Sequence, residues 1–309
     1  MVKSFEDCLK TNDIEELRAL KKGDLHNHIA RGGNINSLKK HFNVSNINKP
    51  VKYLSFDKME SWYKSNIGCY FNEYTYPLRI KWALEQLSLD GITMAVLTFG
   101  YQELKLFDSV SDFICWQTKM FNEYAPNTEI IPEIGINSNC SLENLKDELK
   151  LIFKFDFFKS IDIHGKEIKN PEKYIDIYKL AKKNGLKLRA HIGEFSDPEL
   201  INKTIDVLEL EEINHGNRAV ESVTLLKKIK KKGIRLNLCP ESNLQLNLYE
   251  DLNAHPIRKL FDFGIIVTIN TDDMLIFDKS LSQLYIDLFN NNIFSSKELE
   301  KIRMDSLWF

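Results

Sequence analysis

Histidine and carboxylate residues stand in this sequence where apolar runs end. The segment KGDLHNH over residues 22–28 sets His26 and His28 two residues apart. Because alternate side chains of a β-strand point to the same face, a strand there would aim both imidazoles in one direction. Two such nitrogens could bind one metal ion, although two polar residues on a loop would show the same spacing.

Two later segments carry the same kinds of side chain. In RAHIGE over residues 189–194, His191 could supply a third nitrogen ligand and Glu194 could act as a proton donor. The segment TINTDD over residues 268–273 ends in Asp272 and Asp273. Adjacent carboxylates raise one another's pKa and are costly unless a cation or an acid-base role holds them there. Asp-Asp pairs are also common on exposed turns, so neither segment is decisive alone.

Eight short apolar runs predict the strands that would position these residues. They cover residues 20–25, 93–99, 130–136, 157–163, 186–190, 212–214, 234–238 and 265–269. Most are too short for helices and several are rich in Ile or Val, as expected of strands buried on both faces. From residue 157 onward the starts lie roughly 20 to 30 residues apart, which is the pitch of a β-α unit. Eight such units predict an α/β fold of the (β/α)8 barrel type, with a doubly wound sheet as the alternative.

Helical spacing between the predicted strands supports the same architecture. Apolar residues share one face in three segments: Leu142, Leu145, Leu149 and Ile152; Tyr174, Ile177, Tyr178 and Ala181; Val220, Val223, Leu226 and Ile229. Gly185, Gly233 and Gly264 stand where helices should end in a left-handed residue. Residues 34–86 are longer than one crossover, so we expect extra helices inserted after the first strand, covering the top of the barrel. The sequence has no Pro/Gly/Ser-rich linker, which predicts one domain over residues 1–309.

Taken together, these polar residues are stronger evidence for a functional site than any one segment is. His26 and His28, His191, His215 and Asp272 belong to predicted units one, five, six and eight, each near the C-terminal end of its strand. That end of the barrel is where barrel enzymes keep their sites. A nitrogen-rich set with one carboxylate suits Zn²⁺ and leaves a position for water, whose pKa the metal would lower toward neutrality. These residues predict a metal hydrolase.

Composition excludes several other classes. The chain has 309 residues, 43% hydrophobic and 28% charged, with a net charge of -2, so it has no basic field for nucleic acid. The sequence contains no run approaching 18 apolar residues, and its charged N-terminus lacks the apolar core of a signal peptide. The five cysteines are scattered without a CxxC pair. We therefore expect a cytoplasmic protein with reduced, buried thiols and no membrane or nucleic-acid partner, and the oligomeric state stays open.

Six short motifs resemble the adenosine deaminase family. They are LHNH at 25–28, HIGE at 191–194, NHGNR at 214–218, CPESN at 239–243, HPIRKL at 255–260 and NTDD at 270–273. They follow the family's order with plausible gaps and cover the chain from Lys22 to its end, most weakly over residues 34–160. Zinc deaminases that use cysteine ligands are excluded, because the cysteine spacing does not fit.

The resemblance implies a role for each matching residue. His26, His28, His191 and Asp272 would bind zinc, with Asp272 part of the catalytic set and His28 also near the substrate. Glu194 would protonate the ring nitrogen next to the attacked carbon, and His215 would orient the attacking hydroxide. Asp273 and the backbone of Gly165 would contact the purine. The implied reaction is zinc-dependent hydrolytic deamination of an aminopurine, adenosine or a related nucleoside, to the 6-oxo purine and ammonia.

The sequence departs from the family after the first motif. Ala30 replaces the polar side chain that meets the sugar in adenosine-specific members, unless a one-residue insertion shifts the alignment. Arg31 could bind a phosphate or carboxylate of the substrate, or be a solvated loop residue. Asn214 and Met274, which we expect near the mouth of the barrel, also differ from the residues that are usual in the family. The alternatives are deamination of adenine or of a modified or anionic adenine derivative, cleavage of another C–N bond, and a non-catalytic nucleoside-binding protein.

Overall fold

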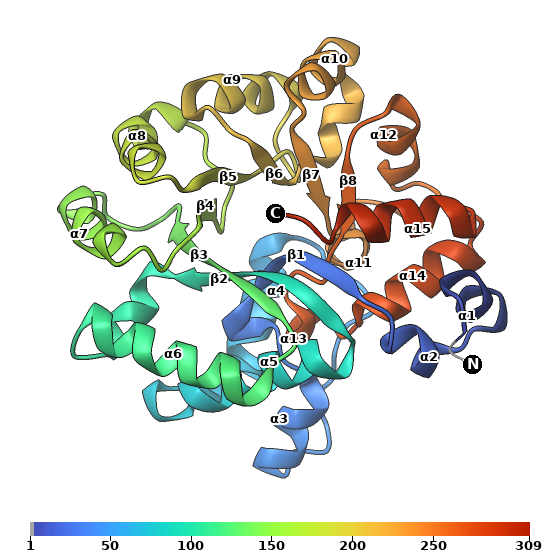
Figure 1. Ribbon diagram of the computed structural model, residues 1–309, viewed down its shortest axis with the longest axis horizontal. Helices are drawn as coiled ribbons and strands as arrows, with labels where there is room; N and C mark the ends of the chain where they lie inside the picture. The colour runs from blue at the N-terminus through green and yellow to red at the C-terminus, as the bar shows by residue number, and fades with distance from the viewer. Residues whose placement is uncertain (1–2) are drawn as a thin grey trace.

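The computed structural model describes residues 3–309, and eight parallel strands form its centre. Each strand is hydrogen-bonded to the next in chain order, and helices surround the ring of strands (Figure 1). The strands are β1 (Lys22–His28), β2 (Ile92–Gly100), β3 (Glu129–Asn137), β4 (Ser160–His164), β5 (Lys187–Ile192), β6 (Glu212–His215), β7 (Arg235–Leu238) and β8 (Val267–Ile269). A parallel bridge between Asn27 and Asp272 joins the last unit back to β1, so the barrel nearly closes. The predicted (β/α)8 barrel is confirmed.

Helices alternate with the strands and pack on their outer side. They are α1 (Phe5–Thr11), α2 (Ile14–Arg18), α3 (Ile35–Phe42), α4 (Phe56–Asn66), α5 (Tyr76–Leu89), α6 (Val110–Tyr124), α7 (Leu145–Ile152), α8 (Ile175–Lys183), α9 (Pro198–Leu208), α10 (Val223–Lys232), α11 (Pro240–Gln245), α12 (Ile257–Phe263), α13 (Met274–Phe277), α14 (Leu281–Asn290) and α15 (Ser296–Asp305). Short 3₁₀ turns lie between several of them. Within the described residues, no helix has the length and apolar character that a bilayer-spanning segment needs.

Most sequence predictions of local structure are confirmed, with four corrections. Gly185, Gly233 and Gly264 follow helices with φ of 77°, 67° and 84°, the left-handed conformation that glycine adopts without a Cβ clash. β1 carries both His26 and His28 but starts at Lys22, two residues later than predicted, and β4 starts at Ser160, three residues later than predicted.

The other two corrections concern burial. Val223 was expected on the buried face of its helix but is 58% exposed, because it is the first residue of α10, whose buried face is formed by Leu225, Leu226 and Ile229. Cys69 and Cys115 were expected to be buried but lie on the surface, whereas Cys8 and Cys239 are buried as predicted.

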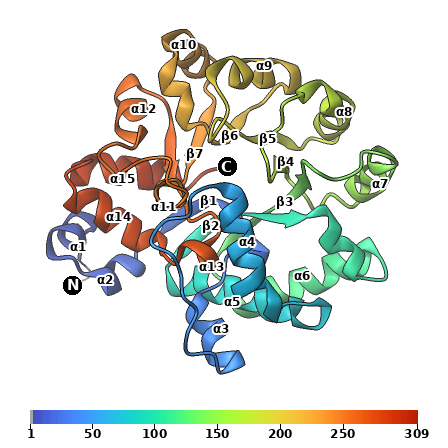
Figure 2. The same cartoon turned by 180° about the vertical axis from the view of Figure 1, so that it is seen from behind.

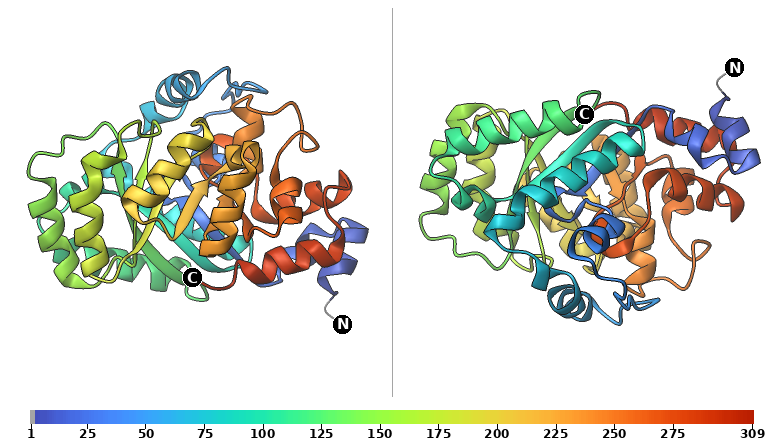
Figure 3. Two further views of the ribbon diagram at one scale, coloured as in Figure 1. Left: turned by 90° about the horizontal axis from the view of Figure 1, so that it is seen from above. Right: turned by 90° about the horizontal axis from the view of Figure 1, so that it is seen from below.

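The insertion after β1 lies at one end of the barrel. Figure 2 shows α4 crossing that end beside β1, and Figure 3 shows the insertion projecting from it. A second apolar cluster holds it there, in which Met59 and Tyr63 of α4 pack near Leu246 and Phe277 from the loops after β7 and β8. Of the insertion aromatics, Trp62, Tyr63, Tyr70 and Phe71 join this cluster and Tyr74 is exposed. The expected cover over the barrel is therefore present, and we call α4 the lid helix.

Ionic side chains fill part of the barrel interior. Arg189 is fully buried, with Nη1 2.7 Å from Glu133 Oε2 and Nε 3.3 Å from Glu212 Oε2. Arg235 lies 2.5 Å from the other oxygen of Glu212. A buried carboxylate is costly unless it is paired and hydrogen-bonded, so these charges depend on one another.

Arg189→Ala should destabilise the fold strongly, because it leaves Glu133 without its cation in a site closed to water. We expect a loss of about 3–5 kcal/mol in the free energy of unfolding, measured by urea denaturation. The surface pair Lys182–Glu209 is the control, and Lys182→Ala should change stability by no more than about 1 kcal/mol. Equal losses in the two variants would contradict this assignment.

Candidate active site

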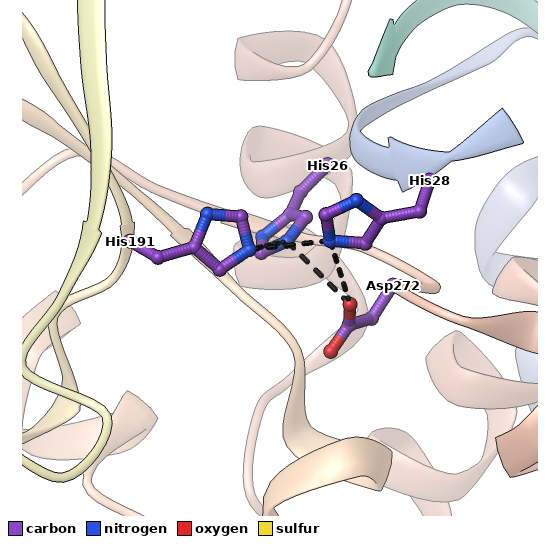
Figure 4. Close-up of side chains that lie close together, drawn as sticks. All are labelled: His26, His28, His191 and Asp272. Carbon is purple, nitrogen blue, oxygen red and sulfur yellow. Dashed lines mark hydrogen bonds and ion pairs between the residues drawn. The ribbon is translucent and has the colours of Figure 1, made fainter. Parts of the chain in front are cut away.

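Four side chains converge at the C-terminal end of the barrel. His26 and His28 come from β1, His191 from β5, and Asp272 from the loop after β8 (Figure 4). The Nε2 atom of His191 lies 3.0 Å from that of His26 and 3.2 Å from that of His28. Asp272 Oδ1 lies 3.6 Å from Nε2 of His26 and 3.5 Å from Nε2 of His28. The structure therefore brings together the four residues that were predicted to bind metal.

The donor set fits a divalent cation. Four ligands at about 2.0–2.1 Å from Zn²⁺ in a tetrahedron lie about 3.3 Å from one another, and the observed separations fall on both sides of that value. Burial lowers the pKa of His28 to about 3, and burial with neighbouring imidazoles lowers the pKa of His26 and His191 well below the usual range. Neutral imidazole is the form that binds metals. Burial, followed by the negative charge of Asp273, raises the pKa of Asp272 well above its usual range, and a bound cation would favour the ionised carboxylate.

Asp162, which lies deeper in the barrel on β4, orients His191. Its carboxylate on β4 lies 2.8 Å from His191 Nδ1, which directs the Nε2 lone pair of that imidazole toward the other ligands. Asn214 donates to Asp162 Oδ1 at 3.2 Å and accepts from Arg189 at 2.7 Å. Our sequence analysis missed this role of Asp162. The signal was its position two residues before His164 on a strand, since both side chains then point into the barrel.

Glu194 and His215 lie beside the four-residue cluster. His215 Nδ1 is 3.7 Å from Glu194 Oε1, and the His215 backbone has φ of 69°, a left-handed conformation uncommon for a non-glycine residue. Both side chains are buried. Burial, followed by the negative charges of Asp272 and Glu167, raises the pKa of Glu194 well above its usual range. A protonated carboxyl group is thus available at the site.

A hydrogen-bonded chain fixes Glu194 from the outer side. Asn243 Nδ2 donates to Glu194 Oε1 at 2.7 Å, and His255 Nε2 lies 3.0 Å from Asn243 Oδ1. His255 Nδ1 accepts from the backbone of Ile257 at 3.1 Å, which places the ring proton on Nε2.

Glu167 holds the loop that carries Glu194. Its Oε1 accepts from the backbone amides of Glu194 and Phe195 at 2.5 and 3.2 Å, and its Oε2 accepts from the amide of Ser196 at 2.6 Å and from the Ser196 hydroxyl. Our sequence analysis gave Glu167 no role. A single acidic residue in a loop has no pattern that reveals which distant amides it will meet.

A cavity of about 540 Å³ opens over these residues. Its walls include Gly165, Asp273 and the lid residues Met59 and Glu60. Gly165 has φ of 88°, which glycine adopts easily. Because it has no side chain, its backbone itself forms part of the cavity wall.

Arg31 links the lid helix to Asp273. Its Nη1 lies 2.6 Å from Glu60 Oε1 and 3.0 Å from Asp273 Oδ2, and its guanidinium lies over the ring of Tyr63 at 4.2 Å. Two carboxylates therefore already pair with the cation that was predicted either to bind a substrate anion or to be a solvated loop residue. The other oxygen of Asp273, Oδ1, is buried and has no hydrogen-bond partner among residues 3–309.

The sequence profile of the family described as adenosine deaminase matches residues 140–308, more than half of the chain. The chain belongs to the adenosine deaminase family. It is a hydrolytic deaminase of adenosine- or adenine-type substrates, and deaminases of this type are generally metal-dependent. The resemblance carried by the six motifs is confirmed.

Three similar proteins extend the comparison. A Treponema pallidum protein, named only provisionally as an adenosine/adenine deaminase, is 28% identical over 301 residues, 94% of this chain and 98% of its own length. The adenine deaminase of Arthrobacter aurescens superposes with a TM-score of 0.78 at 20% identity, covering 92% of each chain. An amidohydrolase solved with bound Zn has a TM-score of 0.71 at 16% identity, covering 99% of this chain and 88% of its own. The two solved structures establish likeness of fold alone.

Asp162→Asn should weaken metal binding, because a neutral amide polarises His191 less than a carboxylate does. We expect about 10–100-fold lower affinity, measured by competition with a chromophoric chelator. Asp176→Asn on the surface of α8, where Asp176 pairs with Lys146, is the matched control and should leave affinity unchanged. Unaltered affinity in Asp162→Asn would remove Asp162 from the metal site.

Glu167→Ala should slow turnover without releasing metal, because the amides of residues 194–196 lose their acceptor and the proton donor shifts. We expect a fall in kcat of about 100-fold, with metal stoichiometry unchanged. Glu167→Gln keeps one acceptor oxygen and should recover part of the rate. An unchanged kcat in Glu167→Ala would show that the loop holds its position by other contacts.

Proposed function

We propose that this protein is a zinc-dependent deaminase that hydrolyses the 6-amino group of adenosine or a related adenine compound, acting as one unit over residues 1–309. One observation supports this most: three members of the four-residue donor cluster line one cavity together with His215 and a buried carboxyl group of raised pKa, that of Glu194. His26, His28, His191 and Asp272 would hold the metal. When bound, Zn²⁺ supplies a water of lowered pKa as the nucleophile at near-neutral pH.

Glu194 would act as the proton donor. Its raised pKa favours the protonated form, and Asn243 occupies Oε1, so Oε2 is the oxygen that can carry the proton into the cavity. Transfer of that proton to the ring nitrogen next to C6 would remove double-bond character there and make C6 more electrophilic. Of the two protons of the attacking water, one would return to Glu194 and the other would reach the 6-amino group, which would then leave as ammonia.

His215 would orient the attacking water. Burial lowers its pKa to about 3, so its imidazole is neutral and can accept a hydrogen bond. Its Nδ1 has no hydrogen-bond partner among residues 3–309, and its ring centroid lies 4.7 Å from that of His26 and 5.2 Å from that of His191. This placement supports a position beside the reacting water.

Asp273 and Gly165 would recognise the purine. The unpartnered Oδ1 of Asp273 is a buried acceptor, and a buried acceptor without a partner is costly until a donor reaches it. The bare backbone at Gly165 allows close approach of a flat ring. Free adenine is the second candidate substrate, because Ala30 offers no side-chain hydrogen bond to a sugar and one structural neighbour is named adenine deaminase.

Glu194→Gln tests the proposed reaction. The amide keeps the volume and the hydrogen bond to Asn243 but has no acidic proton, so kcat for adenosine and adenine should fall by about 10²–10⁴-fold. Zinc content, measured by elemental analysis, should match the parent protein. Glu250→Gln, on the exposed loop after β7, is the control and should keep full activity. Substantial ammonia release by Glu194→Gln would mean that another group supplies the proton.

A further inference from the structure

The join between β8 and β1 differs from the other joins of the barrel. Every other pair of neighbouring strands shares a parallel register of backbone positions. Between β8 and β1, the described residues hold one isolated bridge, from Asn27 to Asp272. The metal cluster spans this seam, with His26 and His28 on the β1 side and Asp272 on the other (Figure 4). The alignment of the two sides therefore depends on contacts other than a strand ladder.

Side chains satisfy the β1 amides along this seam. The amide of Gly23 donates to Ser306 Oγ at 2.9 Å, and the amide of Leu25 donates to Asn270 Oδ1 at 2.8 Å. Buried backbone donors need an acceptor, and a neighbouring strand would normally supply it. The seam is thus closed by particular side chains, so substitutions there can change how its two sides align.

Asp24 holds the residue that precedes the metal-cluster carboxylate. Its Oδ1 accepts from the Thr271 amide at 3.2 Å, and its Oδ2 accepts from the Thr271 hydroxyl at 2.5 Å. Asn27 Nδ2 donates to both side chains, at 3.1 Å to Asp24 Oδ2 and at 3.0 Å to Thr271 Oγ1. All three residues are buried. We call Asp24, Asn27 and Thr271 the seam clasp.

The backbone of Asp272 depends on support of this kind. Its φ is 60°, a left-handed conformation that is uncommon for non-glycine residues and persists where the surrounding structure fixes it. Its amide donates to the His26 carbonyl at 3.0 Å, and its carbonyl accepts from the His28 amide at 3.4 Å. The seam clasp adds a hold on the preceding residue, Thr271, and so fixes the chain on entry to Asp272.

We propose that the seam clasp is a set of positioning residues that aligns the Asp272 carboxylate with the histidines of β1. The inference rests on the proposed function, because it requires the four-residue cluster to bind the metal. The clasp residues neither belong to that cluster nor line the cavity, so their effect passes through Asp272. Without the clasp, the loop after β8 would move relative to β1 and carry the carboxylate oxygen away from the other ligands.

Thr271→Val tests the clasp, because it removes the hydroxyl and nearly keeps the shape of the side chain. We expect Zn²⁺ affinity, measured by competition with a chromophoric chelator, to fall about 10–100-fold. The visible absorption of Co²⁺ bound in place of Zn²⁺ should also change, because it reports the arrangement of the ligands. Thr271→Ser keeps the hydroxyl and should retain the affinity and spectrum of the parent protein. Thr204→Val, at a buried threonine of α9 whose hydroxyl donates to the Leu200 carbonyl at 2.7 Å, is the control and should change neither.

Asp24→Asn is a second variant, and it decides the question if Thr271→Val does not fold. It keeps the size of the side chain but sets an amide where Thr271 and Asn27 donate, and it should weaken Zn²⁺ binding by a similar factor. Circular dichroism checks the fold of each variant before metal is added.

The outcomes separate two kinds of failure. Parent-like affinity and Co²⁺ absorption in Thr271→Val and Asp24→Asn would overturn the clasp and leave the proposed function standing. A loss in Thr271→Val that is equally large in Thr271→Ser would also overturn it, since the hydroxyl would not be the cause. A parent protein that binds neither Zn²⁺ nor Co²⁺ would overturn the metal-dependent function itself, and the role of the clasp with it.

Discussion

The mouth of the barrel concentrates the lone pairs and carboxyl groups of buried side chains at the floor of one cavity. Asp272 and Asp273 are adjacent and buried, and three imidazoles made neutral by burial turn Nε2 atoms toward one another. Lone pairs that face one another cannot form hydrogen bonds with each other. The arrangement is therefore unfavourable until a cation lies at its centre. Closure of the sheet brings these side chains together, because β1, β5 and β8 are distant in sequence and their C-terminal ends meet only at one end of the closed barrel.

Support for the metal cluster comes from polar side chains below it in the barrel interior. A chain of contacts runs from Glu133 to Arg189, then to Asn214, Asp162 and His191. Each charge in this chain meets an opposite charge or a hydrogen-bond partner, which limits the cost of burial. Asn214, one of the residues that differ from the family pattern, provides the amide that links Arg189 to Asp162. This link supports the carboxylate that orients His191.

Local sequence patterns were enough to predict the barrel and the polar residues at the ends of its strands. The strands follow from short Ile- and Val-rich runs, and His26, His28, His191 and Asp272 meet because parallel strands end at one edge. Glu167 and Glu60 could not be found this way, since their partners are fixed by loops and by an inserted helix packed through long-range contacts. The two carboxylate partners of Arg31 could not be found for the same reason, since they come from different elements.

Apolar packing, more than charge, fixes the lid helix over the site. The pairs Arg31–Glu60 and Lys166–Asp57 are partly or largely exposed, and pairs of that kind stabilise by about 0–1 kcal/mol. Met59 and Tyr63 are 2% and 7% exposed, and burying a large apolar side chain contributes about 1.5–3 kcal/mol. The ion pairs instead decide which charges face the cavity. Arg31 donates to Oδ2 of Asp273 and leaves Oδ1 as a buried acceptor that has no partner among residues 3–309.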